Sequence, residues 1–459
     1  MKTGVYATET PATGVARGRT GRTLRRGIAQ LSLLGASQVG VTLVALGTQV
    51  FLARALSREH FGAVVTVMSL VTLVGPLALF GVAELWLQRF GREGPRAFRW
   101  VRPSLRLVGA GTAVLVVTLL LWGALDRRDP VLAAMRIALS LMIPAQVAMA
   151  LAGSVLQLRG AYAALAILQL LPQSGRFLVA VAAWLLGLSV FAVAASFAVV
   201  AALTVLLAAL VLVPFIRARV VLEGHVRHRP TRAGRSPRPA HLIQGASPFM
   251  LGSVFYLLGI HLGVVVSGEF LSRDAAALLA VPTAMLTAVY LLPRVIYQQY
   301  FLAKLHRWSR FDTEALLIAY RLGTWVMSLC GIGIALLIAV GGLWLIPAIF
   351  GSAYHESTSI MALLALAIPL RFAAASLASL LTSGGLLRRK VLYQGVGAAA
   401  YVGGLCATIP VLGVMGVALT TVLTEATLLA LFWRSVQKHI VAGATLPSWS
   451  TIRRRLLAA

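Results

Sequence analysis

The sequence LSRE at residues 56–59 recurs as LSRD at residues 271–274, and each copy lies between two long apolar segments. Two very short turns, at residues 187–189 and 410–413, also occupy matching places in the two halves of the chain. A chain that repeats its own pattern at half-length is typical of membrane transporters built from two similar helical bundles.

The composition indicates that the lipid bilayer is the solvent of this protein. Apolar residues make up 59% of the 459 residues, charged residues only 12%, and the mean hydropathy is +0.88. A soluble fold of this composition would have too little polar surface to cover itself. A membrane-spanning helix needs roughly 20 mostly apolar residues, because the helix satisfies its own backbone amides.

We therefore predict an all-α polytopic membrane protein with twelve transmembrane helices in two six-helix bundles related by an internal repeat. The predicted spans are residues 28–53, 62–87, 107–125, 131–155, 161–186, 190–215, 248–270, 275–297, 319–346, 357–381, 391–410 and 412–433. The predicted parts are a basic tail (1–27), an N-terminal bundle (28–215), a basic linker (216–247), a C-terminal bundle (248–434) and a second basic tail (435–459).

The placement of positive charge orients these spans. With a cytoplasmic amino terminus, most of the 41 Lys and Arg residues fall in cytoplasmic segments. The exceptions in outer segments are Arg54, Arg58, Arg127, Arg128 and Arg273. This asymmetry follows the positive-inside rule, so we expect both termini, both tails and the linker to be cytoplasmic. Topology and attraction to anionic lipid then explain the net charge of +28 without a nucleic-acid partner.

Signals of catalysis and of metal binding are missing from the sequence. The outer loops are too short to build an active site, and no GxxxxGK[ST] phosphate loop is present. The eight histidines show no metal-ligand spacing. Cys330 and Cys406 lie in separate predicted spans, where cysteine usually serves as apolar filler. We expect a protein that is not an enzyme and that uses no cofactor or metal.

Ionisable side chains inside the spans are the sharpest functional signal, because a charge at that depth is costly unless it faces a polar cavity or a partner. The arginines and the accompanying glutamine are Arg176, Arg371, Arg136, Arg294 and Gln173. Arg176 and Arg371 lie deepest. The four arginines outnumber the two acids that we place inside the spans, Glu84 and Glu425. We therefore predict a cationic cavity suited to a phosphate or pyrophosphate group, which a guanidinium can bind with two hydrogen bonds.

Glu84, Glu425 and His261 complete the intramembrane set. Glu425, near mid-span, fits either a proton carrier or the counter-ion of an arginine, and the sequence leaves both roles open. His261 is a second candidate for proton coupling, although a backbone carbonyl can also satisfy a lone imidazole. Glu84, like Arg136 and Arg294, lies close enough to a span end to reach the headgroup layer instead.

The opening spans resemble the amino-terminal signature of polysaccharide transporter proteins. In residues 47–62, GTQVFLARALSREHFG, the first helix ends in an Ala-Arg-x-Leu motif, a short acidic turn follows, and Phe-Gly opens the second helix. The stretch GVMGVA at residues 413–418, with Glu425 beyond it, is similar to the closing helix of that family. The resemblance covers essentially the whole chain and is to the Wzx-like flippase branch of the MOP superfamily.

This resemblance implies two six-helix bundles around a central cavity. It implies a flippase that moves undecaprenyl-pyrophosphate-linked oligosaccharide across the bacterial inner membrane by alternating access, for O-antigen, lipopolysaccharide or other polysaccharide biosynthesis. The implied partners are the lipid-linked oligosaccharide and membrane lipids, with the polymerase and glycosyltransferases of the same pathway as further candidates. Twelve spans differ from the fourteen that are typical of lipid II flippases.

Two alternatives stay open. A MATE-type, cation-coupled multidrug exporter of the same superfamily would need acids in its cavity, whereas this sequence offers mainly arginines. A non-transporting membrane component of polysaccharide assembly would tolerate the loss of the intramembrane charges.

Overall fold

The computed structural model describes residues 16–220, 222, 237–301, 305, 308, 312–383 and 385–442, and every regular element within them is helical. Most of the predicted linker and parts of both predicted tails, residues 1–15 and 443–459, lie outside the described residues. The N-terminal half contains α1 (Ala16–Ala55), α2 (Arg58–Leu79), α3 (Val82–Glu93), the 3₁₀ turn η1 (Gly94–Ala97), α4 (Phe98–Leu125), α5 (Pro130–Leu139), α6 (Met142–Leu158), α7 (Tyr162–Leu186) and α8 (Val190–Ile216).

The C-terminal half contains the same kinds of element, with several π-helical turns that continue the longer helices. Its elements are α9 (Pro239–Leu257), η2 (Leu258–Leu262), α10 (Gly263–Val266), η3 (Ser267–Leu271), α11 (Arg273–Arg294), η4 (Val295–Phe301), α13 (Thr313–Phe350), η5 (Ser352–Tyr354), α14 (Ser357–Ala365), α15 (Ala367–Ser383), α16 (Leu387–Leu412), α17 (Val414–Val436) and η6 (Gln437–Val441).

Eleven helical segments of the described chain are long and apolar enough to cross a membrane. One of them, Arg58–Leu125, has 68 residues, far more than a single crossing needs. It reverses direction at Gly94, whose φ of 57° ends α3, and both α2 and α3 then pack against α4. The segment therefore holds two of the predicted spans. The predicted all-α polytopic fold of about twelve spans is confirmed.

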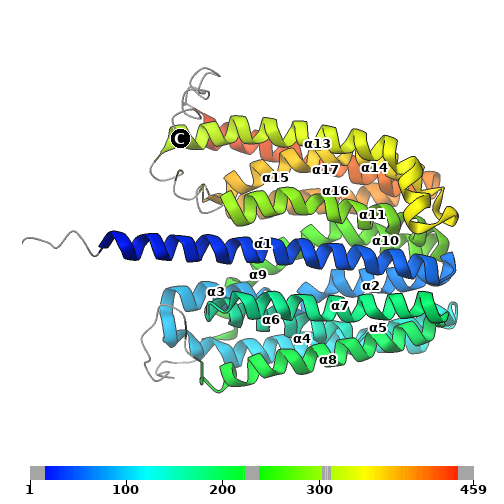
Figure 1. The fold of residues 1–459 in the computed structure, drawn as a ribbon, viewed down its shortest axis with the longest axis horizontal. Helices are drawn as coiled ribbons and strands as arrows, with labels where there is room; N and C mark the ends of the chain where they lie inside the picture. The colour runs from blue at the N-terminus through cyan, green and yellow to red at the C-terminus, as the bar shows by residue number, and fades with distance from the viewer. Residues whose placement is uncertain are drawn as a thin grey trace, which may run out of the picture.

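The helices lie side by side along the long axis of the molecule (Figure 1). We call α1–α8 the N lobe and α9–α17 the C lobe; α1 packs on α7 of its own lobe and also touches α11 and α13. The start of α1 and the end of α17 lie at one end of the bundle, which we call the terminal end (Figure 1). The opposite, distal end contains the connections at residues 56–57, 126–129, 272 and 351–356.

The repeated LSRE and LSRD sequences begin equivalent helices. The Ser57 side chain accepts a hydrogen bond from the His60 amide (3.3 Å) at the start of α2, and Ser272 accepts one from the Ala275 amide (3.0 Å) at the start of α11. Serine is a preferred residue at this position because it satisfies an amide that has no partner within the helix.

Gly62 lets the two repeats meet. A Cβ atom added at Gly62 would lie 1.8 Å from the carbonyl oxygen of Arg273, so only glycine allows α2 to approach the start of α11 so closely. This contact fixes the N lobe against the C lobe near the distal end.

The two predicted tight hairpins are confirmed. Gly187, at a φ of 64°, ends α7, and α8 begins after Ser189; Gly413, at a φ of 55°, alone joins α16 to α17. The helix α1 begins at Ala16, within the predicted basic tail 1–27, and so extends beyond the predicted first span. Once a long helix has nucleated, each added residue gains a backbone hydrogen bond, so the helix extends beyond its apolar part.

Candidate functional site

Two of the cavities between the described helices contain most of the predicted site residues in their linings. The first, the N-lobe cavity, has a volume of about 360 Å³ and is lined by α1, α6, α7 and α8 together with Arg294 of α11. The second, the C-lobe cavity, has a volume of about 790 Å³ and is lined mainly by α9, α11, α15, α16 and α17, with Glu84 of α3 at one side. Because Arg294 lines both, the two cavities adjoin at its side chain.

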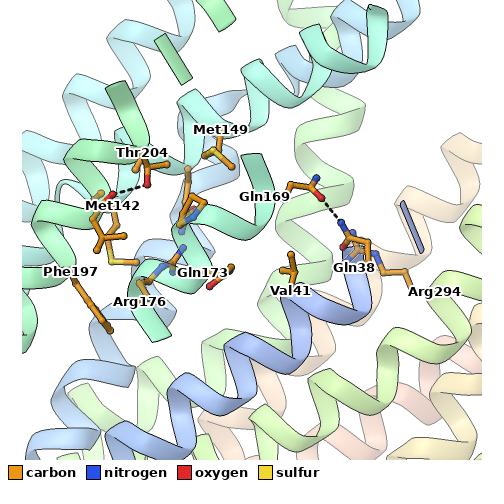
Figure 2. A pocket seen from close by; sticks show the side chains of 15 residues that line it. Gln38, Val41, Met142, Met149, Gln169, Gln173, Arg176, Phe197, Thr204 and Arg294 are labelled. Atoms are coloured by element: carbon orange, nitrogen blue, oxygen red, sulfur yellow. Dashed lines mark hydrogen bonds between the residues drawn. The ribbon is translucent and has the colours of Figure 1, made fainter. Parts of the chain in front are cut away.

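Uncharged polar side chains line part of the N-lobe cavity, and Figure 2 shows several of them around Arg176. Four glutamines and one threonine line it: Gln38, Gln146, Gln169, Gln173 and Thr204. The Gln38 amide donates to Oε1 of Gln169 at 2.9 Å, which joins α1 to α7.

Three residues of the predicted site, Arg176, Gln173 and Arg294, meet at this cavity. Among the described residues, neither Arg176 nor Arg294 has an ion-pair partner. A guanidinium held in a membrane-spanning segment without a counter-ion can bind an anion, because its desolvation is otherwise uncompensated.

The C-lobe cavity contains an ion pair. Arg371 of α15 donates a hydrogen bond to Glu425 of α17, and the Glu425 side chain is only 6% exposed. The Arg371 guanidinium also lies 5.0 Å from the ring centre of Tyr256 and 5.2 Å from that of Tyr290. This is the geometry that the counter-ion role of Glu425 requires, and it leaves Arg371 less available to a ligand than Arg176.

Glu84 reaches the C-lobe cavity because the second span is broken. Phe80 and Gly81 have φ values of 52° and 69°, so α2 ends and α3 begins with Glu84 in its first turn. The Glu84 carboxylate lines the cavity, and its buried Oε2 atom has no hydrogen-bond partner in the described part of the chain. The positive end of the α3 dipole favours a negative charge there.

Lys390 and four tyrosines of the C-lobe cavity have no counterpart among the predicted site residues. Lys390 donates to the Thr382 hydroxyl (3.1 Å). It lies one residue before the predicted span 391–410, so we used its charge only to orient the spans. The tyrosines gave no sequence signal, since an aromatic residue in an apolar helix is most often part of the core.

Arg136 and His261, in contrast, line neither cavity. Arg136, 1% exposed, lies at the distal end, where it donates to Asp126 and to Glu269 and lies 4.3 Å from the centre of the Trp122 ring. His261 lies in the π-helical turn η2. The structure therefore does not place Arg136 and His261 together with the other predicted site residues.

Among the described residues, five ion pairs join the two lobes at the distal end, and two of them link the repeated motifs reciprocally. Arg58 of the first motif pairs with Asp274 of the second (3.2 Å), and Arg273 of the second pairs with Glu59 of the first (3.4 Å). The others are Arg58–Glu356 (3.3 Å), Arg273–Asp129 (3.3 Å) and Arg136–Glu269. These contacts hold the lobes together at this end.

The described residues contain no group of three or more His, Cys, Asp or Glu side chains that could hold a metal ion. The polar groups that line the two cavities are guanidinium, ammonium, carboxylate, amide, phenol and aliphatic hydroxyl groups.

No protein-family model and no curated protein sequence matches this chain. Several solved structures are similar to it in fold. An inward-facing multidrug resistance MATE family transporter of the MOP superfamily aligns with a TM-score of 0.69 at 15% identity, over 91% of this chain and 98% of that one. The lipid II flippase MurJ, in an inward closed conformation, aligns with a TM-score of 0.67 at 12% identity, over 89% of each chain.

A third match is the eukaryotic MATE transporter AtDTX14, with a TM-score of 0.59 at 13% identity, over 94% of this chain and 98% of that one. At such identities the likeness concerns the fold. This chain is a multi-pass membrane protein with the fold of MOP-superfamily transporters and flippases.

Proposed function

We propose that this protein is a flippase that moves undecaprenyl-pyrophosphate-linked oligosaccharide from the inner to the outer leaflet of the bacterial inner membrane, for O-antigen or other polysaccharide biosynthesis. It is not an enzyme: the lobes alternately open the adjoining cavities to either side while the lipid tail stays in the bilayer. Both termini are cytoplasmic in this proposal, as the positive charge favours. The MOP-superfamily fold supports a transport role.

The observation that carries the proposal is the Arg176 guanidinium, which lines an amide-rich cavity without an ion-pair partner among the described residues. Arg294 adds a second cation to the same lining. A pyrophosphate diester offers several oxygens to planar guanidinium groups, and glutamine amides donate further hydrogen bonds. A cationic drug would be repelled by the same pair.

An export assay tests this assignment. In a strain that lacks the chromosomal copy, Arg176→Ala is expected to abolish surface glycan while protein abundance stays near normal, and Arg176→Lys to restore it only in part, because an ammonium lacks the bidentate fork. Arg106→Ala is the matched control, since Arg106 is exposed on α4 and lines neither cavity. Normal export with Arg176→Ala would contradict the proposal.

For energy coupling we favour Glu84 over Glu425. Glu425 forms an ion pair with Arg371, whereas Glu84 has no ion-pair partner in the described part of the chain. A carboxylate without a fixed counter-ion can gain and lose a proton as its cavity opens to each side in turn. His261 has no cavity contact that would couple it to substrate.

A second candidate function, export of organic cations, rests on one observation: the C-lobe cavity combines aromatic rings with the carboxylates of Glu84 and Glu425. Aromatic rings and acids together attract cations. Expression in an efflux-deficient strain decides between the two functions. The flippase proposal predicts unchanged tolerance to ethidium and benzalkonium, and a large rise in tolerance that Glu84→Gln abolishes would favour the exporter.

A further inference from the structure

The C-lobe cavity has a lining that a pyrophosphate contact does not use. Four tyrosines from three continuous helical segments line it together: Tyr256 of α9, Tyr290 of α11, Tyr297 of η4, which continues α11, and Tyr401 of α16. Its volume, about 790 Å³, is more than twice that of the N-lobe cavity and is typical of sites for small organic molecules.

Three polar atoms at this cavity lack partners. The hydroxyl of Tyr290, Oε2 of Glu84 and Oε2 of Glu425 are each buried and have no hydrogen bond to any described residue. Buried polar atoms in folded proteins are nearly always paired, so each needs an explanation. Hydroxyl groups of a ligand can donate hydrogen bonds to such carboxylate and phenol oxygens.

The Arg371–Glu425 ion pair positions the polar and aromatic groups of this cavity. Arg371 occupies one oxygen of Glu425 and leaves the other available, and its guanidinium lies beside the rings of Tyr256 and Tyr290, which holds these rings in place. Rigid phenol rings offer an apolar face together with a polar edge. Sugar rings have the complementary surface, with C–H groups on one face and hydroxyl groups around the edge.

The charge of the cavity argues against an organic cation. Arg294, Arg371 and Lys390 face Glu84 and Glu425, so the cationic side chains outnumber the carboxylates. A neutral, hydroxyl-rich ligand avoids this excess, whereas a cationic one does not.

We propose that the C-lobe cavity binds the sugar residue next to the pyrophosphate, while the N-lobe cavity binds the pyrophosphate itself. The inference rests on the proposed function. Arg294 lines both cavities, so a pyrophosphate that contacts its guanidinium has the attached sugar at the entrance to the tyrosine-lined space. The headgroup then spans the two lobes and can couple their movement.

Binding to the purified protein in nanodiscs tests the inference. The probes are undecaprenyl pyrophosphate without sugar and the same lipid carrying one glucose or one N-acetylglucosamine. The wild type is expected to bind at least one sugar-bearing lipid about tenfold or more tightly than the bare lipid. Tyr256→Leu and Tyr290→Phe should each reduce this gain several-fold without changing the affinity for the bare lipid, whereas Arg176→Ala should weaken the binding of all three.

Tyr393→Leu is the matched control, because Tyr393 lies on α16 against Phe432 and outside the lining. Tyr290→Phe removes a single hydroxyl, so it keeps the test valid if Tyr256→Leu does not fold.

The outcomes separate the two proposals. The sugar site would be overturned if the wild type bound all three lipids with equal affinity. It would also be overturned if the tyrosine variants lowered the affinity for the bare lipid as much as that for the sugar-bearing lipids. In either case, binding that depends on Arg176 would still support the flippase proposal. Failure to bind any of the lipids would overturn both. Tight binding of tetraphenylphosphonium that Tyr256→Leu abolishes would show a cation site instead.

Discussion

Glu269→Gln should loosen the contact between the lobes at the distal end. Glu269, whose side chain is 10% exposed, is the C-lobe partner of Arg136, whose side chain is 1% exposed. The substitution removes one charge-assisted hydrogen bond, while Arg136 keeps its second partner, Asp126, within the N lobe. Hydrogen bonds to charged groups contribute about 1.5–3 kcal/mol. The lost bond therefore shifts the equilibrium toward separated lobes by about 10- to 150-fold.

The rate of thiol modification measures this shift. Cys330 and Cys406 are exposed and are first replaced by serine, and Ala277→Cys then places one thiol at a fully buried position on α11, one turn beyond Arg273. When opening and closing are fast, the rate at which a membrane-impermeant methanethiosulfonate reacts follows the population of the open form. Glu269→Gln should raise that rate about 10- to 150-fold.

Glu356→Gln is the control, because Glu356 belongs to the same set of ion pairs but is 70% exposed. Exposed ion pairs contribute about 0.2–1 kcal/mol, so the rate should rise by less than about sixfold. Equal rates for wild type and Glu269→Gln would refute the reasoning that the buried ion pair holds the lobes closed.

Three further predictions use other parts of the structure. The hydrogen bond from Arg136 lowers the pKa of Asp126 below its usual 3.8, so the stability that Asp126→Asn removes is present above about pH 4 and is lost as the carboxyl protonates. The unfolding temperatures of the wild type and Asp126→Asn should differ at pH 7, and the difference should shrink as the pH falls below about 4. A difference that stays constant with pH would contradict this. Glu84→Gln should remove the response of export to collapse of the proton gradient in intact cells, whereas Glu425→Gln should lower the unfolding temperature; the reverse result would exchange their roles. Gly62→Ala should destabilise by several kcal/mol, on the order of other backbone clashes, measured by thermal unfolding, because its Cβ would overlap the opposite repeat; an unchanged unfolding temperature would show that the lobes need no such contact.

The sequence was sufficient for the fold because local signals determine most of it. Apolar stretches of span length predicted the helices, and the very short turns at residues 187–189 and 410–413 predicted the hairpins. The second span was predicted as one helix, yet it breaks at Phe80 and Gly81.

The site could be predicted only in part, because hydropathy gives the depth of a residue in the membrane but not the face of the helix on which it lies. A helix that is apolar all round has no stripe that marks its inner side. The sequence placed Arg136 nearer to a span end than Arg371, but it did not show that Arg136 pairs across the lobes at the distal end and that Arg371 lines a cavity. Ion pairs between distant positions, such as Arg371 with Glu425, follow from tertiary packing alone.

The most direct test of the central claim is lipid flipping by purified protein in proteoliposomes. The measurement follows the appearance of fluorescently labelled undecaprenyl-pyrophosphoryl-N-acetylglucosamine in the opposite leaflet, detected by an impermeant quencher. Wild-type protein and Arg106→Ala should both accelerate its transfer. Arg176→Ala should reduce the rate to that of protein-free vesicles, because Arg176 lines the N-lobe cavity without an ion-pair partner among the described residues. Transfer at the wild-type rate by Arg176→Ala would contradict the account.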